Sequence, residues 1–116
     1  MRTQIGLIGD TMNWARIVMN HMMMNYNTDE FPEYENSRKL CRCKNNNNEE
    51  ITGHIFDNLS GMFDKVYVPA DISNADLWDL RHRHMNDINE IYFVDDHFRI
   101  NKIDWAQITI DDKDKI

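Results

Sequence analysis

The chain has 116 residues, of which 41% are hydrophobic and 28% charged, and its net charge is −7 at pH 7. This length fits one folded domain rather than two, and this balance of residues excludes a disordered chain. No apolar run is long enough to cross a bilayer, and no basic start precedes an apolar stretch, so we expect a cytoplasmic protein. The acidic charge also argues against broad nucleic-acid binding, which needs a clustered positive surface.

The first predicted unit is a strand, a tight turn and a helix. The stretch "TQIGLIGD" is a short apolar run that ends in Gly9 and Asp10, and "TMNWARIVMNHMMMN" after it has helical spacing. Asp10 or Thr11 is placed to cap the helix by accepting a bond from a free backbone N–H. The methionine-rich face of the helix indicates core packing, with a partner-binding surface as the alternative.

The next segment, at about 27–50, is predicted to be a polar excursion on the surface. The stretch "EYENSRKLCRC" allows a short helix, and "KNNNNEE" is polar low-complexity sequence. Cys41 and Cys43 form a Cys-x-Cys pair, which cannot by itself complete a four-ligand zinc site, and His54 is a candidate for a third ligand. We therefore expect free loop thiols, no metal site and no cofactor.

The second half of the chain predicts a strand, a helix and another strand. "ITGHIFDNLSGMF" is ambiguous between helix and strand because two glycines weaken either, whereas "DKVYVP" is a short buried strand that Pro69 ends. Ser73 or Asn74 can cap the following helix, which has Asp76 in its first turn. "EIYFVDD" is the next strand, and "FRINKIDWAQITIDDKDKI" is either a helix with a last strand or a hairpin.

This order of elements predicts the fold class. Strands and helices alternate with enough spacing for right-handed crossovers, which favours a parallel sheet with helices on its faces. We expect residues 1–116 to form a single α/β domain, a small Rossmann-like three-layer sandwich with a mostly parallel sheet.

The stretch "DLRHRHMND" concentrates basic side chains in an acidic protein. At about 100° per residue, Arg81 and His84 fall on the side of the helix that carries Leu77, Leu80, Met85 and Ile88. His82, Arg83 and Asn86 fall outside that arc, and His82 and His84 diverge too far to chelate one metal ion. One interpretation is that Arg81 pairs with Asp79, Asp87 or Asp95 at the core edge and His84 is a hydrogen-bonded, semi-buried histidine. The alternative is that Arg81 or His84 meets an anionic or sugar-bearing ligand.

A ligand site in an open parallel sheet is expected at the carboxyl ends of its strands. Gly9 would let a ligand approach the backbone there, with Asp10 and Thr11 beside it and Arg81, His84 and Asp87 on the later helix. Asp95 and Asp96 would accept ribose hydroxyls or stabilise a cationic sugar transition state, and Trp78 or Tyr92 could flank a base. "GLIGD" matches neither the dinucleotide fingerprint nor the P-loop.

Two stretches, "IGLIGDTMNWARIVMNHM" and "DLWDLRHRHMNDINEIYFVDD", resemble small phage and bacterial proteins similar to nucleoside 2-deoxyribosyltransferases. The resemblance covers about half of the chain and implies a Rossmann-like sheet with a nucleoside or nucleotide crevice. Family enzymes carry a glycine-rich segment with a nucleophilic glutamate after the strand. Here that segment reads "DDHFRINKIDWA", in which only Asp95, Asp96 or Asp104 could supply the carboxylate.

Two functions are consistent with these features. The first is a nucleoside- or nucleotide-binding protein, including a divergent N-glycosidic-bond enzyme with Asp95 and Asp96 as catalytic carboxylates; whether it catalyses a reaction is left open. The second is a non-enzymatic acidic protein of phage or viral type that binds a host protein, supported by the charge of −7 and the missing catalytic segment. The resemblance and the methionine-rich helix are also compatible with a homodimer.

Overall fold

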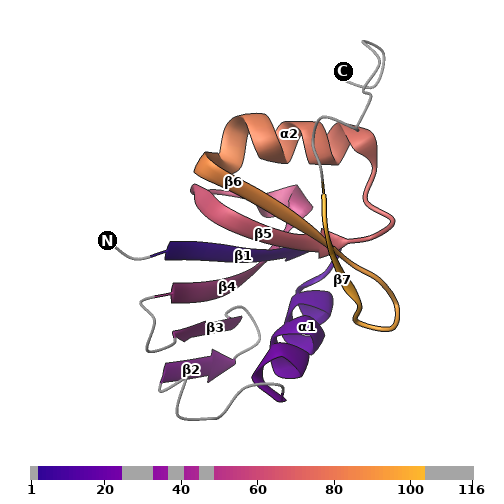
Figure 1. Cartoon of the computed structure of the whole chain (residues 1–116). Coiled ribbons are helices and arrows are strands. Elements are labelled where there is room, and N and C mark those ends of the chain that lie inside the picture. Colours follow the sequence, from indigo (N-terminus) through magenta and orange to yellow (C-terminus); the bar gives the residue numbers. More distant parts are fainter. Residues whose placement is uncertain (1–2, 25–32, 37–40, 45–48, 104–116) are drawn as a thin grey trace.

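The structure is a computed structural model, and it describes residues 3–24, 33–36, 41–44 and 49–103 (Figure 1). These residues form seven strands, two α-helices and one short 3-10 helix. In chain order the elements are Thr3–Gly9 (β1), Met12–Met24 (α1), Glu33–Asn36 (β2), Cys41–Lys44 (β3), Glu49–Ile55 (β4), Phe56–Asn58 (the 3-10 helix), Phe63–Pro69 (β5), Asn74–His84 (α2), Met85–Val94 (β6) and Ile100–Lys102 (β7).

All seven strands belong to one sheet, with the order β2-β3-β4-β1-β5-β6-β7. The four central strands, β4, β1, β5 and β6, are parallel to one another. Antiparallel pairs extend the sheet at both edges, where β3 pairs with β4, β2 with β3, and β7 with β6. The predicted α/β class with a mostly parallel sheet is therefore confirmed, with antiparallel strands added at the edges.

β1 is the central strand of the parallel part and has buried residues on both of its faces. Successive side chains of a strand point to opposite faces, so Ile5 and Leu7 face one layer while Ile8 faces the other. A strand covered on both faces must be apolar almost throughout, and this explains the continuous run "IGLIG". Gly6 leaves room for the ring of Phe63, which lies 2.9 Å from where a Cβ atom would be.

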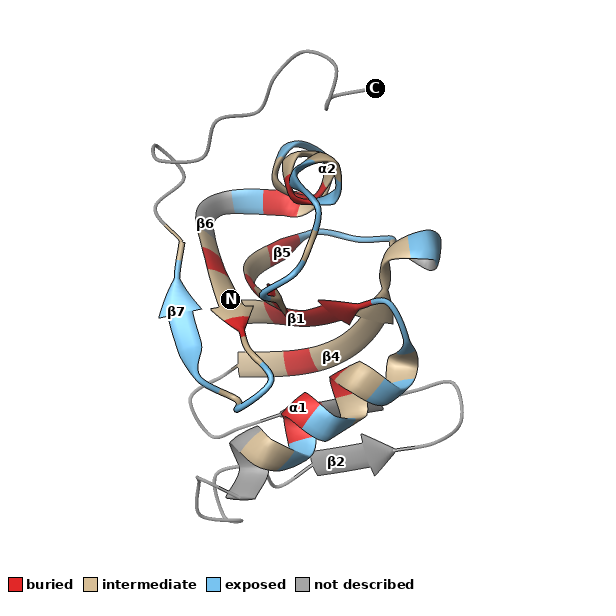
Figure 2. Cartoon of the chain, turned by 90° about the vertical axis from the view of Figure 1, so that its right-hand side faces the viewer, coloured by how far each residue is buried: buried red, intermediate tan, exposed pale blue. Residues whose placement is uncertain are grey.

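The two helices lie on opposite faces of the sheet (Figure 2). α1 covers the face that carries Leu7, and α2 covers the face that carries Ile8. The buried residues on the α1 side are Ile5, Leu7, Ala15, Val18, Met19, Cys43, Ile51 and Val94. The buried residues on the α2 side are Ile8, Phe63, Val66, Val68, Leu77, Leu80, Met85 and Ile91.

Both helices begin at the capping residues that the sequence suggested. The Thr11 hydroxyl accepts the backbone N–H of Trp14 at 3.2 Å, at the start of α1. The Ser73 hydroxyl accepts the backbone N–H of Asp76 at 3.1 Å, at the start of α2. In both cases the side chain satisfies a donor that has no partner inside the helix.

The polar segment at about 27–50 differs from its prediction. Its described parts, Glu33–Asn36 and Cys41–Lys44, are strands of the sheet, where the sequence had allowed a short helix in "EYENSRKLCRC". Residues 37–40 of that stretch lie outside the described residues. Cys43 is only 1% exposed and packs in the core beneath α1 rather than in a loop. β3 pairs antiparallel with both β2 and β4, so pairing within the sheet decides the conformation here.

The remaining differences concern where elements end. α2 ends at His84, so Met85 is buried as the first residue of β6 rather than as part of the helix. β7 pairs antiparallel with β6, as expected for the hairpin alternative, and residues 104–116 lie outside the described residues. Within the described ranges, neither helix has the length and apolar character needed to cross a bilayer.

Candidate functional site

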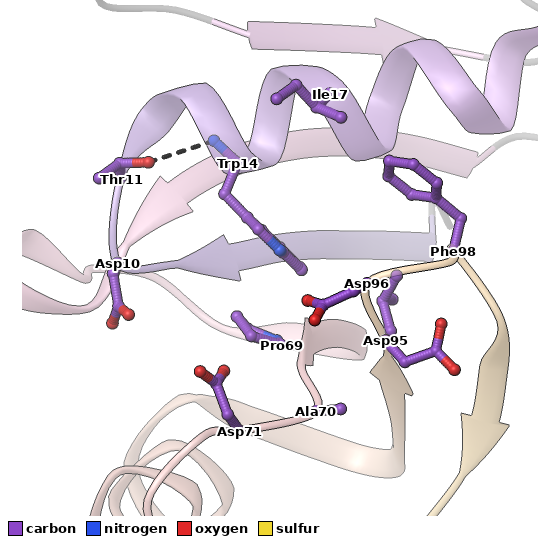
Figure 3. Close-up of a pocket in the computed structure, with 11 residues that line it drawn as sticks. Asp10, Thr11, Trp14, Ile17, Pro69, Ala70, Asp71, Asp95, Asp96 and Phe98 are labelled. Atoms are coloured by element: carbon purple, nitrogen blue, oxygen red, sulfur yellow. Dashed lines mark hydrogen bonds between the residues drawn. The ribbon is translucent and has the colours of Figure 1, made fainter.

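A crevice of about 600 Å³ opens at the carboxyl ends of β1, β5 and β6 (Figure 3). One wall comes from the start of α1, a second from the turn after β5, and a third from the turn between β6 and β7. The lining residues are Asp10, Thr11, Trp14, Ile17, Pro69, Ala70, Asp71, Val94, Asp95, Asp96 and Phe98.

The strand order explains why the crevice lies here. After β1 the chain crosses through α1 on one face to β4, whereas after β5 it crosses through α2 on the other face to β6. The two connections leave neighbouring strands in opposite directions, so the chain separates above their carboxyl ends. Open α/β sheets characteristically place their ligand sites at such a switch point.

Trp14 forms the aromatic wall of the crevice and depends on a glycine behind it. Gly9 ends β1, and a Cβ atom at this position would lie 2.6 Å from Cε3 of the Trp14 indole. The glycine thus makes room for Trp14, where the sequence had suggested room for a ligand beside the backbone. Figure 3 shows the indole directed from the first turn of α1 toward Pro69 and Asp96.

Three carboxylates at the crevice have no partner among the described residues. In Figure 3 those of Asp10 and Asp71 point toward each other, and that of Asp96 points toward Trp14. All three side chains are exposed, and none makes a hydrogen bond or ion pair with another described residue. No lysine, arginine or histidine is among the lining residues, so the crevice is acidic.

Asp95 lines the same crevice but its side chain holds the backbone of the β6–β7 turn. Its Oδ1 accepts the backbone N–H groups of His97 at 2.8 Å and of Arg99 at 2.9 Å. These bonds, that from Arg99 first, lower the pKa of Asp95, because they favour the charged carboxylate. In Figure 3 this carboxylate points away from Trp14, so Asp95 is a structural residue of the turn.

The same turn holds an aromatic residue in an unusual backbone conformation. Phe98 has a φ of 60°, and its backbone N–H bonds to the Asp95 carbonyl at 3.0 Å. This bond closes a β-turn, and Phe98 is the left-handed residue at its end, a position at which glycine is usual. The conformation costs a residue with a side chain about 1–2 kcal/mol. The Phe98 ring stacks on His21 of α1, with centroids 4.5 Å apart.

The basic residues of α2 lie at the opposite end of the sheet from the crevice. α2 runs antiparallel to β5, so its last turn lies near the amino ends of the strands, and the His84 Nδ1 donates to the Gly61 carbonyl at 3.1 Å. Arg81 and His84 are half-buried while His82 and Arg83 are exposed, as the helical phase predicted. Neither Arg81 nor His84 lines the crevice; the Asp87 side chain lies outside the described residues.

The other predicted ligand positions have local partners. Trp78 stacks on His82 at 4.2 Å, and Tyr92 stacks on Tyr67 at 4.9 Å on a face of the sheet. The Tyr92 hydroxyl donates to Glu90 at 2.8 Å; burial first, and then this bond, raise the pKa of Tyr92 to about 12. Neither Trp78 nor Tyr92 lines the crevice.

Cys43 and His54 do not share a metal site. Cys43 pairs with Ile51 and packs beneath α1, whereas His54 contacts Phe63 edge-on at 4.9 Å in the layer beneath α2. His54 Nε2 lies 2.7 Å from the Thr52 hydroxyl, and burial lowers the pKa of His54. Among the described side chains, no cluster of three histidine, cysteine or acidic residues could hold a metal ion.

The structure therefore brings together Asp10, Thr11, Asp95 and Asp96 of the predicted site, and the further lining residues include a fourth aspartate, Asp71, and the aromatic residues Trp14 and Phe98. Asp71 follows β5 and could have been found by applying the strand-end argument to "VYVPAD" as well. The only feature of the sequence that could have indicated Trp14 is its position, since it is an aromatic residue in the first turn of the helix that follows Asp10 and Thr11. No feature of the sequence indicated Phe98, since its position depends on the conformation of the turn.

Comparisons with protein-family models, with curated proteins and with solved structures find no match for this chain. The resemblance to nucleoside 2-deoxyribosyltransferase-like proteins therefore stays a prediction. The crevice and its residues are the features from which a function can be argued.

Proposed function

We propose that this protein binds a nucleoside in the crevice, on a small Rossmann-like three-layer fold. The observation that carries the proposal is a crevice at the switch point of a parallel sheet that combines an aromatic wall with carboxylates to which no other described residue bonds. A crevice of about 600 Å³ is of the size that small-molecule sites have.

The two kinds of lining residue suit the two parts of a nucleoside. The indole of Trp14, with Ile17 and Val94, offers an apolar surface against which a planar base can pack. The carboxylates of Asp10, Asp71 and Asp96 are acceptors for sugar hydroxyls, and hydrogen bonds to charged acceptors are the stronger kind.

The charge of the crevice favours a nucleoside over a nucleotide. Among the described residues that line it, four are aspartates and none is basic. A phosphate would face these carboxylates without a compensating cation, because Arg81, the basic residue expected to meet an anion, lies toward the other end of the sheet. The sequence left nucleoside and nucleotide open, and we propose the unphosphorylated ligand.

If the protein also cleaves or transfers a glycosidic bond, Asp96 is the carboxylate for that role. Asp95 is committed to two backbone N–H groups and its lowered pKa makes it a weaker base. Asp96 points toward Trp14 and makes no bond to another described residue. A carboxylate placed there could stabilise positive charge at the anomeric carbon or attack it.

Calorimetry and thermal-shift assays with purine and pyrimidine nucleosides, their 5′-monophosphates and free ribose test the proposal. A ligand that binds only the native state raises the midpoint of unfolding. We expect binding of at least one nucleoside, weaker binding of its monophosphate, and a loss of about tenfold in affinity for Asp96→Asn and for Trp14→Leu.

Asp79→Asn is the matched control, because Asp79 pairs with Arg83 on the surface of α2 at 2.9 Å, away from the crevice. If no nucleoside binds the wild-type protein, the proposal is wrong. The favoured hypothesis is then a non-enzymatic acidic protein that binds a host protein, and capture of a protein partner at low ionic strength is the next experiment.

A further inference from the structure

Several features of the turn between β6 and β7 together fix the position of the Phe98 side chain. Asp95 ties the backbone of His97 and Arg99, the backbone of Phe98 is left-handed, and the Phe98 ring stacks on His21 and lines the crevice. Backbone strain of this kind persists only when the surrounding contacts hold it in place.

The contacts show how the turn is held. The backbone N–H of Asp95 bonds to the carbonyl of Arg99 at 3.1 Å, and that of Phe98 bonds to the carbonyl of Asp95 at 3.0 Å. The Asp95 carboxylate adds two further bonds from within the turn. Asp95 is thus a partner in all four bonds. Without its side chain the two main-chain bonds would remain, but His97 and Arg99, which flank the left-handed residue, would each lose a bond.

We infer that Asp95 is a positioning residue that fixes Phe98 as the end wall of the crevice, and that Phe98 limits the size of the ligand. In Figure 3 the Phe98 ring lies between the turn and α1, on the side of the crevice away from Asp10 and Asp71. Asp96, the next residue, takes its direction from the same turn. The size limit rests on the proposed function, whereas the wall can be tested without a ligand.

The first test measures access of a neutral quencher to Trp14. The protein for this test carries Trp78→Phe and Trp105→Phe, so that Trp14 is its single tryptophan, and acrylamide quenches its fluorescence. Asp95→Ala and Phe98→Ala should each raise the quenching constant about twofold, since loss of the wall exposes more of the indole. Asp95→Asn keeps an oxygen acceptor for both N–H groups and should stay close to the parent.

Two results would overturn the inference about the wall. An unchanged quenching constant in Asp95→Ala would show that this residue does not position the turn, and an unchanged constant in Phe98→Ala would show that its ring is not the wall. Asp79→Ala serves as the control for a lost surface carboxylate, and circular dichroism with thermal unfolding confirms that each variant is folded.

The second test compares ligands of different size in the same variants. If the wall limits ligand size, Asp95→Ala should narrow the difference in affinity between small pyrimidine and large purine nucleosides, and Asp95→Asn should preserve it. If the difference in affinity between pyrimidine and purine nucleosides is the same in all variants, Phe98 does not limit the size of the ligand. Failure of every nucleoside to bind the wild-type protein would instead overturn the proposed function, while the quenching result would still decide the wall.

Discussion

At the scale of single residues, the shape of the crevice depends on side chains that neighbouring residues restrict to one conformation. Trp14 occupies the space that a side chain on Gly9 would need, and Phe98 is held by Asp95. Gly9, which lies outside the lining, and Asp95, whose carboxylate bonds to its own turn, each set the direction of an aromatic side chain that lines the crevice. Substitutions at these two residues should therefore alter the crevice as much as substitutions of the aromatic residues themselves.

The pair of Gly9 and Trp14 gives a prediction for stability. Gly9→Ala should destabilise the protein by about 1–3 kcal/mol, because its Cβ would lie 2.6 Å from the indole and force the ring to shift. Gly9 does not adopt a positive φ, so the cost should come from this contact. Urea unfolding of both single variants and of Gly9→Ala with Trp14→Ala measures the coupling. Additive costs in the double variant would refute the explanation.

Tyr92 gives a prediction for high pH. Its pKa is raised from 10.0 to about 12, so the unfolded chain loses this proton first, and the stabilising contribution present below pH 10 should disappear between pH 10 and about 12. Ultraviolet titration should show one of the four tyrosines ionising late. Glu90→Gln should shift that transition to lower pH, and Tyr92→Phe should remove it. If a late transition remains in Tyr92→Phe, it belongs to another tyrosine and the prediction is wrong.

At the scale of elements, α2 carries a prediction about its start. Ser73→Ala should reduce the free energy of unfolding by about 1 kcal/mol, because the N–H of Asp76 loses its acceptor. Asn74→Ala is the control, since it changes an exposed residue in the first turn without removing the cap. Chemical denaturation compares the two variants, and equal effects would mean that the Ser73 hydroxyl contributes nothing as a cap.

The same scale shows what the sequence could predict. β1, β5 and α2 were predictable because apolar runs, helical spacing and capping residues all indicate the same element. β2 and β3 were not, because their polar residues gain a strand conformation only by pairing at an edge of the sheet. Helical phase placed Arg81 and His84 on the correct side of α2 but could not say toward which end of the strands they lie.

The site was predictable to a similar extent and for related reasons. Asp10, Thr11, Asp95 and Asp96 follow apolar strands, so the expectation that strand ends meet brought them together. That argument cannot tell a carboxylate that faces the crevice from one that bonds to its own turn, which is the difference between Asp96 and Asp95. The left-handed backbone of Phe98 has no signature in sequence, since glycine is the residue that normally indicates it.

At the scale of the whole molecule, the net charge of −7 and the acidic crevice act in the same direction. Cations should reach Trp14 more easily than anions. In the single-tryptophan protein, caesium should therefore quench fluorescence more strongly than iodide after correction for their intrinsic efficiencies. The difference between caesium and iodide quenching should shrink when added salt shortens the screening length to about 10 Å at 0.1 M. It should also shrink in the double variant Asp10→Asn with Asp96→Asn. Equal quenching at low salt would mean that the crevice is not negative.

The central place of β1 has a consequence for how the protein is made. β1 is the first strand in the chain, yet both of its neighbours, β4 and β5, begin more than 40 residues later. During synthesis β1 can pair with β4 only after Ile55 has left the ribosome, and with β5 only after Tyr67 has left it. Long-range pairing of this kind slows folding and prolongs exposure of apolar surface. Chaperone dependence and losses to aggregation should accordingly be governed by this interval rather than by the stability of the finished sheet.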